Sequence, residues 1–234
     1  MKPQLQLPIQ LIIAILTIGP AVGQKLTTEN QNLKGWTKDA KIFYADFKGK
    51  PNDQFKSLNK EVGLQASAQV GLKSILDVPK KKRDRGRLLE KVYVAPFFIK
   101  TASVTLTKDE KELEKQRLYF DMAESFARIM RREIEHIADS AKTYGTTWIM
   151  YSSIKNYYCS ELGRMFNDYT YEVFVEKKEG AYEKWRALID KALSETDKFA
   201  TKKEDCHRLL TNLPIDPEYE QSEKVLDTFM KCSQ

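Results

Sequence analysis

The sequence has few of the residues that metal and redox chemistry use. It contains only two histidines, His136 and His207, and three cysteines. No C-x-x-C pair occurs, so neither a zinc ribbon nor a thioredoxin-like redox motif is indicated. No G-x-S-x-G motif occurs either, which leaves the nucleophile elbow of a serine hydrolase without support.

No apolar run reaches the about 20 residues that a membrane-spanning helix needs. The apolar stretch at residues 7–18 follows Lys2 and precedes small residues, an order that is typical of a secretory signal peptide. We predict that residues 1–23 are such a signal, cleaved after Gly23, and that no membrane span remains afterwards. An uncleaved anchor is the alternative. Export would place the protein in the periplasm or outside the cell.

The cysteines gain importance if the chain is exported, because an oxidising compartment permits a disulfide. They are Cys159, Cys206 and Cys232, an odd number that leaves one thiol over. A bond between Cys206 and Cys232 would close the C-terminal tail. A bond between Cys159 and Cys206 would join that tail to the body. The sequence leaves the pairing open.

The formal net charge of +6 is spread over a chain in which acidic and basic residues are intermixed. This pattern predicts a solvated surface, and we expect no nucleic-acid partner. One basic run is the exception, and it comprises Lys80, Lys81, Lys82, Arg83, Arg85 and Arg87. We interpret it as the tip of a hairpin, with a contact to an anionic polymer or to lipid headgroups as the alternative. No aromatic residue interleaves it, as a platform for single-stranded nucleic acid would require.

The first half of the chain carries the pattern of strands. Residues 41–44 are expected to be extended, residues 64–78 alternate apolar and small polar positions, and residues 88–106 are rich in β-branched and aromatic residues. The basic run lies between the last two segments. The sequence therefore predicts an antiparallel hairpin with this run at its connection.

The second half carries the spacing of helices. A long helix is expected from Thr107, as its N-cap, to Gly145, as its C-terminal cap. Further elements are predicted as helices at residues 148–166 and 180–193 and a short strand at residues 169–175. We expect an α+β domain over residues 24–199, in which a small antiparallel sheet from the first half packs on the long central helix and on the further helices. Residues 200–234 would form a charged tail with two cysteines over the surface.

A motif in the long helix indicates a family. Residues 115–128 read K-Q-R-L-Y-F-D-M-A-E-S-F-A-R, and the part from Phe120 onward resembles the helix H-E-Q-x-H-F-D-I-A-E-x-x-A-R of a family of predicted secreted zinc-dependent proteases, domain-of-unknown-function family 922. Residues 45–51 are similar to its D-F-x-G-x-P turn, and residues 169–185 to its Y-D-x-E-T-x-H-G stretch with a later tryptophan. The resemblance covers about residues 36–195 and implies an exported bacterial protein with a zincin-like fold.

The other half of the motif departs from the family at the residues that carry the chemistry. In H-E-x-x-H the two histidines bind zinc and the glutamate activates a water molecule. These positions hold Lys115, Gln116 and Tyr119 here, and the later histidine position falls at Val175. Deprotonating an ordinary lysine and an ordinary tyrosine at neutral pH costs about 9 kcal/mol together. This cancels most of the roughly 10–16 kcal/mol that a full zinc site delivers, so we predict no zinc and no other cofactor.

Charged residues of the matching half have a structural interpretation. Asp121, Glu124 and Arg128 are expected to form ion pairs on the helix surface. Glu124 and Arg128 are four residues apart, a spacing at which such a pair contributes about 0.2–0.5 kcal/mol.

Together these observations predict a catalytically inactive, protease-like binding protein. The cleft around Lys115, Gln116 and Tyr119, together with Glu172, would bind a peptide or a protein of the cell envelope. The lysine would supply a cation and the tyrosine an aromatic face with a hydroxyl.

Two alternatives belong to other functional classes. The first is an active hydrolase whose metal ligands have moved, with His136, Glu172 and His207 as the candidates. The second is a purely structural envelope protein, in which the family resemblance reflects ancestry alone. The sequence indicates no oligomeric state for any of the three.

Overall fold

Two long antiparallel strands form the centre of the fold. The computed structural model describes residues 26–223 and 228–230. Its strands are β1 (Leu33–Gly35), β2 (Ala66–Ser67), β3 (Val70–Pro79), β4 (Lys91–Ile99), β5 (Val104–Thr105), β6 (Tyr219–Gln221) and β7 (Thr228–Met230). β3 pairs with β4, β1 lies beyond β4, and β6 and β7 pair with different parts of β3. β2 and β5 form a separate antiparallel pair. The predicted hairpin is confirmed, and the C-terminal part of the chain adds strands to its sheet.

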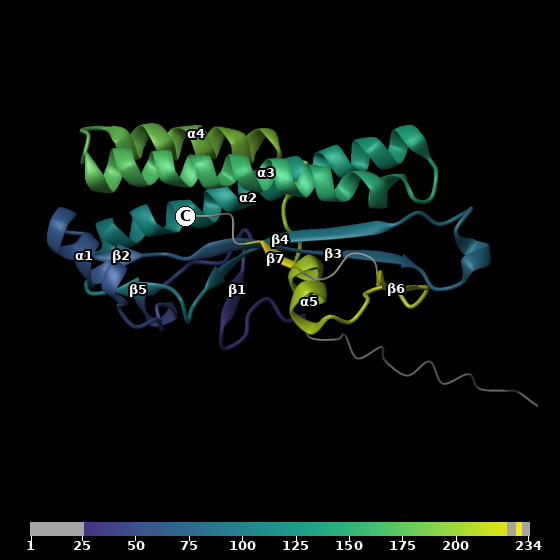
Figure 1. Cartoon of the computed structure of the whole chain (residues 1–234), viewed down its shortest axis with the longest axis horizontal. Helices are drawn as coiled ribbons and strands as arrows, with labels where there is room; N and C mark the ends of the chain where they lie inside the picture. Colours follow the sequence, from purple (N-terminus) through teal and green to yellow (C-terminus); the bar gives the residue numbers. More distant parts are fainter. Residues whose placement is uncertain (1–25, 224–227, 231–234) are drawn as a thin grey trace, which may run out of the picture.

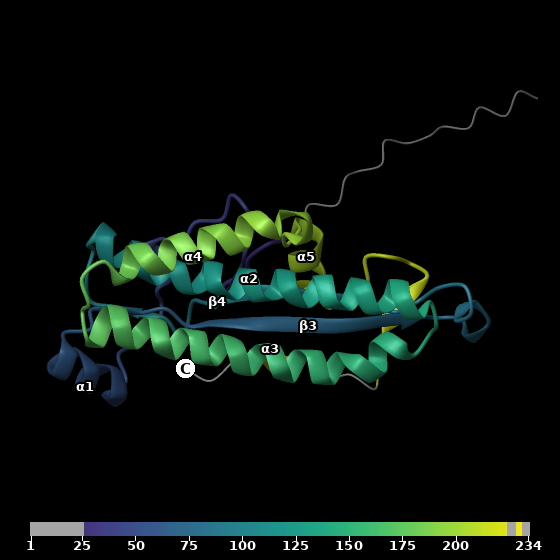
Figure 2. The same cartoon turned by 90° about the horizontal axis from the view of Figure 1, so that it is seen from above.

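The helices cover both faces of this sheet. They are α1 (Asp53–Val62), α2 (Glu110–Ala141), α3 (Thr146–Thr170), α4 (Ala181–Glu195) and α5 (Lys203–Thr211), with 3₁₀ turns η1 (Tyr44–Asp46), η2 (Lys82–Asp84) and η4 (Asp197–Phe199) and a π-helical turn η3 (Tyr171–Val175). Figure 1 shows α2 on one face of β3 and β4 and α5 on the other. In Figure 2, α3 and α4 run along the two sides of α2. The α+β class is confirmed.

The side chains of β3 and β4 divide between two cores because successive residues of a strand point to opposite faces. The core on the α2 side includes Leu72, Leu76, Val94 and Phe98. The smaller core on the α5 side contains Ile75, Ala95, Phe97, Cys206 and Leu209. Burial on both faces explains why these strands contain nearly continuous apolar runs.

The ends of the long helix differ from the prediction. Its N-cap is Asp109, whose side chain accepts a hydrogen bond from the Lys111 N–H at 3.1 Å, and not Thr107. The helix ends at Ala141, and Lys142 is its left-handed cap with a φ of 48°. Gly145 adopts a φ of 99° and precedes α3 instead of ending α2.

One segment predicted to be a strand is helical. Residues 169–175 lie at the end of α3 and in the π-helical turn η3. Of residues 41–44, which were also expected to be extended, 41–43 lie outside every helix and strand, and Tyr44 begins the 3₁₀ turn η1. Helical spacing brings the ring of Tyr169 to 5.7 Å from the ring of Phe174 and to 6.0 Å from the ring of Trp185, measured between centroids. This aromatic packing in the core outweighs the local preference for a strand.

Residues 200–223 are part of the packed fold, so the expected surface tail is wrong for this segment. Cys206, Arg208 and Leu209 of α5 are fully buried. Cys206 carries a free thiol, which excludes both suggested disulfides that involve it, and burial raises the pKa of this thiol to about 12. Cys159 is disulfide-bonded. Cys232 and the predicted signal peptide lie outside the described residues.

No helix within the described ranges is both long and apolar enough to cross a membrane.

Candidate functional site

Gln116, at the position of the family's glutamate, holds the strand β2. Its Oε1 accepts a hydrogen bond from the Ala68 N–H at 2.7 Å, and its Nε2 donates to the Ala66 carbonyl at 3.0 Å. The neighbouring Gln65 carbonyl accepts a hydrogen bond from the Leu106 N–H, directly after β5. Gln116 therefore bonds to the backbone edge of β2 that faces away from β5. With 1% of its surface exposed, Gln116 satisfies buried backbone groups and has little capacity left for a ligand.

Replacing Gln116 with leucine should lower the free energy of unfolding by about 1–3 kcal/mol, because the N–H and C=O that it satisfies become unpaired. Replacing it with glutamate, the family's residue, should be no better. A carboxylate oxygen would then face the Ala66 carbonyl and approach Glu112, whose Oε1 is 3.4 Å from the Gln116 Nε2. Urea unfolding measures both variants. Gln54→Leu, an exposed change on α1, is the control, and an equal loss in the control would contradict this role of Gln116.

Tyr119, at the second histidine position, is buried against other aromatic rings. Its hydroxyl lies 2.6 Å from the Thr170 Oγ1, and its ring centroid is 4.9 Å from that of Tyr169 and 5.3 Å from that of Phe166. Burial raises the pKa of the Tyr119 phenol well above its ordinary value. The residue therefore remains a neutral hydrogen-bonding group and is not a phenolate ligand for a metal.

Lys115 shares the neighbour Glu112 with Gln116, whereas Glu172 bonds elsewhere. The Lys115 ammonium is 3.5 Å from a Glu112 oxygen and 5.8 Å from the centroid of the Phe174 ring. Glu172 accepts a hydrogen bond from the Trp185 indole at 2.8 Å, and this bond lowers the pKa of the Glu172 carboxyl. Of the predicted binding residues, Glu172 lines neither of the hollows described next.

Two adjacent hollows flank the first turns of α2. The first, which we call the groove, measures about 380 Å³ and lies between α1, β2, α2 and α3. The second, which we call the lysine pocket, measures about 590 Å³ and lies between the end of α1, the start of α2 and η3. Leu64 lines both. Gln116 and Tyr119 line the groove, whereas Lys115 lines the lysine pocket. The predicted cleft is therefore divided in two.

The groove combines an apolar wall with a polar rim. Its apolar wall includes Phe55, Leu58, Leu64 and Val104, and its polar residues include Asn52, Gln69, Asn167 and Thr170. The sequence prediction missed α1, which supplies part of this wall. Its start was signalled by Asn52, the N-cap residue, whose side chain accepts a hydrogen bond from the Phe55 N–H at 2.8 Å.

The lysine pocket has an excess of unpaired positive charge. Its charged residues are Lys111, Lys115, Lys177, Lys178, Glu112, Glu114 and Glu183. Glu112 pairs with Lys115 at 3.5 Å, and Glu114 pairs with Arg117 at 2.5 Å. Within the described part of the chain, the ammonium groups of Lys111, Lys177 and Lys178 have no carboxylate within 4.0 Å. Three cations are thus available to an anionic group of a ligand.

The residues suggested for a relocated metal site do not gather. His136 is exposed on α2, and the His207 Nδ1 accepts a hydrogen bond from the Thr27 N–H at 3.1 Å. Glu172 is bound to Trp185 in another part of the fold. The described residues contain no group of three or more His, Cys, Asp or Glu side chains that could hold a metal ion.

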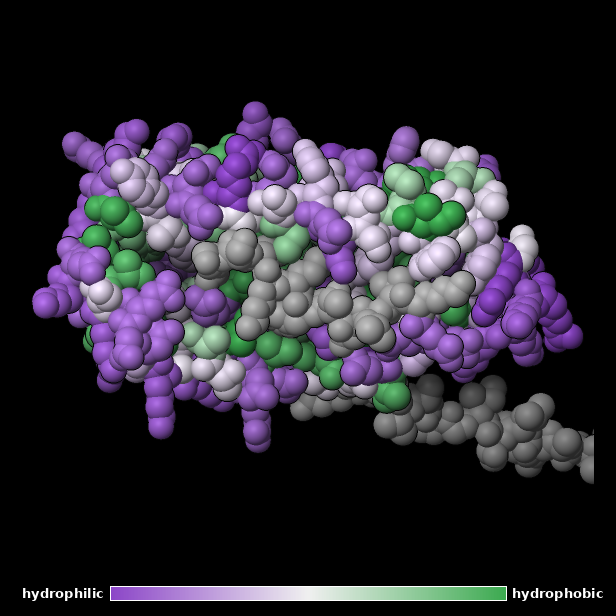
Figure 3. Space-filling model, in the orientation of Figure 1, coloured by the Kyte–Doolittle hydropathy of each residue, from purple (hydrophilic) through white to green (hydrophobic). Residues whose placement is uncertain are grey.

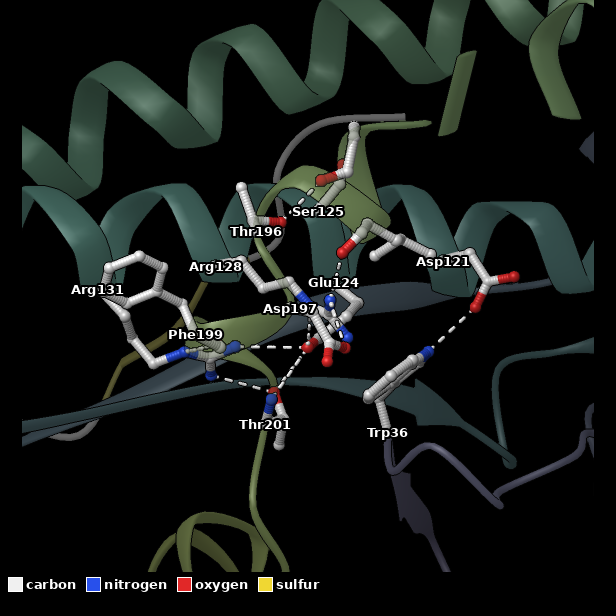
Figure 4. A network of polar contacts seen from close by, with 12 residues as sticks. Trp36, Asp121, Glu124, Ser125, Arg128, Arg131, Thr196, Asp197, Phe199 and Thr201 are labelled. Carbon is white, nitrogen blue, oxygen red and sulfur yellow. Dashed lines mark hydrogen bonds and ion pairs between the residues drawn. The ribbon is translucent and has the colours of Figure 1, made fainter. Parts of the chain in front are cut away.

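The matching half of the motif forms a buried polar network, shown in Figure 4. The side chains of Glu124 and Arg128 are 0% and 3% exposed, so the expected surface ion pair is wrong. Asp121 accepts hydrogen bonds from the Trp36 indole at 2.9 Å and from Arg186 at 2.7 Å. These motif residues hold the fold together and do not line either hollow.

Comparisons with protein-family models, with curated proteins and with solved structures gave no significant match. The resemblance to the secreted zinc-dependent proteases therefore stays a prediction from three short segments of sequence.

Proposed function

We propose that this protein is an exported, non-catalytic binding module that holds a short peptide in the groove and the lysine pocket. The observation that supports this most directly is the position of the two hollows, which meet at Leu64. Each has a volume within the about 300–1,000 Å³ that is usual for ligand sites. Open hollows of this size favour binding over a purely structural role.

The linings suit different parts of one peptide. Phe55, Leu58 and Leu64 offer the groove an apolar surface for a side chain, and the amides of Asn52 and Asn167 can bond to a peptide backbone. In the lysine pocket, Lys177 and Lys178 suit a carboxylate, either of the C-terminus or of an acidic side chain. The preferred ligand is a peptide with one large apolar residue next to an acidic group.

We propose a non-catalytic protein because Gln116 and Tyr119, at the motif positions that carry catalysis in the family, are engaged in hydrogen bonds that stabilise the fold. The oxygen and the nitrogen of the Gln116 side-chain amide are both bonded to backbone, and the Tyr119 hydroxyl is bonded to Thr170. Neither side chain is free to act as a general base. Of these three motif positions, only Lys115 carries a charge, and its side chain is 34% exposed.

Calorimetric titration with short peptides tests this function. Peptides with a leucine or phenylalanine beside a free C-terminal carboxylate should bind, and the same peptides with an amidated C-terminus should bind about tenfold more weakly or worse. In the double variant Lys177→Ala, Lys178→Ala, the peptides with a free carboxylate should bind only as weakly as the amidated peptides do. The thermal midpoint should stay nearly unchanged, because both lysines are exposed.

The matched control is Lys191→Ala with Lys198→Ala, which removes two exposed lysines that line neither hollow. It should leave the affinity for the carboxylate peptides unaltered. Equal weakening by both pairs would mean that only the overall charge matters, and it would count against the lysine pocket as the site. Tyr119 should be tested as Tyr119→Phe, because an alanine there would leave a cavity in the aromatic core.

A further inference from the structure

The connection between β3 and β4 concentrates positive charge at one end of the molecule. It carries Lys80, Lys81, Lys82, Arg83, Arg85 and Arg87, against the single acid Asp84. All but Arg85 of these basic residues are exposed. Arg87 lies 3.7 Å from Glu218, which neutralises part of this charge. We call this segment, residues 80–87, the basic tip.

The basic tip is fixed beside the start of α3. Figures 1 and 2 both place the β3–β4 connection and the α2–α3 turn at the same end of the molecule. The Arg85 guanidinium lies 5.3 Å from the centroid of the Tyr144 ring, which belongs to that turn. Glu90, just after the tip, accepts a hydrogen bond from the Gly145 N–H at 2.5 Å. These contacts hold the charged segment and the helix start as one surface.

The start of α3 presents apolar side chains to solvent at this same end. Ile149 is 65% exposed, Met150 is 41% exposed, and the neighbouring Trp148 is 37% exposed. In Figure 3 a green patch over the N-terminal part of α3 lies next to the purple end of the molecule. A contiguous exposed apolar patch beside polar or charged residues is typical of a surface that interacts with a protein or a membrane.

We infer that this end of the molecule docks on the surface of a lipid bilayer with anionic headgroups. Such a bilayer combines a layer of negative charge with an apolar interior directly beneath it. The basic tip would bind the negatively charged headgroups, and Ile149 and Met150 would contact the apolar interior. A nucleic acid would use the charge alone, since the tip has no interleaved aromatic residues for stacking on bases.

Sedimentation with vesicles tests this docking on the full mature chain. The protein should sediment with vesicles of phosphatidylcholine and phosphatidylglycerol in equal parts, and not with vesicles of phosphatidylcholine alone. The charge reversal Lys81→Glu, Lys82→Glu, Arg83→Glu should weaken the partition by at least about 100-fold, since each cation near an anionic surface contributes about a fivefold factor. Ile149→Ser with Met150→Ser should weaken it by about tenfold.

The control reverses three exposed lysines near or on α1, at the opposite end of the molecule, in the variant Lys50→Glu, Lys56→Glu, Lys60→Glu. It should bind the anionic vesicles at least tenfold more tightly than the tip variant. Equal binding by the two charge-reversed variants would overturn the assignment of the tip. If Ile149→Ser with Met150→Ser binds the anionic vesicles as tightly as the unaltered protein, the apolar contact with the bilayer is overturned. If the unaltered protein binds a DNA duplex as tightly as it binds these vesicles, the choice of a bilayer as the partner is overturned. Circular dichroism confirms that each variant is folded before it is compared.

Discussion

Replacing Glu124 with glutamine will lower the free energy of unfolding by about 3–5 kcal/mol, the usual cost of removing one partner from a buried ion pair. The Glu124 Oε1 lies 2.8 Å from the Arg128 Nε and 3.3 Å from the Arg131 Nη2. It also accepts a hydrogen bond from the Thr201 N–H at 2.8 Å. Glutamine has nearly the same shape but no charge, so both guanidinium groups would lose their buried counter-charge.

The loss will be large because this network connects distant parts of the fold. The Arg128 Nη1 donates to the Leu193 carbonyl at 2.6 Å, at the end of α4. The Arg131 Nη1 donates to the Val94 carbonyl of β4 at 2.5 Å, and its Nε to the Phe199 carbonyl at 2.8 Å. One face of α2 is thereby joined to the sheet and to the segment that leads into α5.

Urea unfolding of Glu124→Gln and of the control Glu135→Gln measures this effect. The control makes the same change of charge on the same helix. Glu135 pairs with Lys198 at 3.1 Å, with side chains 48% and 75% exposed, and such surface pairs contribute about 0.2–1 kcal/mol. An equal loss in the two variants would mean that burial adds nothing to the strength of the Glu124 network.

The elements that were predicted correctly are those whose structure follows from residues close to one another along the chain. The apolar spacing within α2 and α4 and the strand content on both sides of residues 80–87 are local signals, and these elements formed as predicted. Residues 169–175 show the limit of such signals. Alternation of Tyr169, Tyr171, Val173 and Val175 predicted a strand. In the helical turn Tyr169 and Val173 are buried, whereas Tyr171 and Val175 are exposed.

The candidate site could be predicted only in part, because local signals do not show which distant residues meet. The sequence located Lys115, Gln116 and Tyr119 on one helix, but their roles depend on residues far away along the chain. Gln116 bonds to Ala66 and Ala68, about 50 residues earlier, and these are backbone groups with no signature in the sequence. The groove also required α1, a helix placed beside α2 by tertiary packing alone. Its contribution could not be deduced from the motif.

Arg208→Met will have a comparable effect, lowering the free energy of unfolding by about 3–5 kcal/mol. Arg208 and Asp77 are 131 residues apart in the chain and are both fully buried between α5 and β3. The Arg208 Nε and Nη2 donate to the two Asp77 oxygens at 2.9 and 2.6 Å. Without the guanidinium, the buried Asp77 side chain loses both hydrogen bonds that Arg208 donates to it and the counter-charge beside it. Urea unfolding, with an unchanged slope as evidence of a native-like fold, gives the loss.

The double variant Asp77→Val, Arg208→Met distinguishes the pair's net contribution from the cost of breaking it. The native pair already carries a penalty, because the buried Arg208 Nη1 has no hydrogen-bond partner within the described part of the chain. Apolar replacements of buried pairs are often neutral or stabilising by about 1–4 kcal/mol. We expect the double variant to recover at least most of the stability that Arg208→Met loses, with a coupling of about 3 kcal/mol or more between the two sites. If the losses simply add, the two side chains contribute independently, and the pair is not what fixes α5 to the sheet.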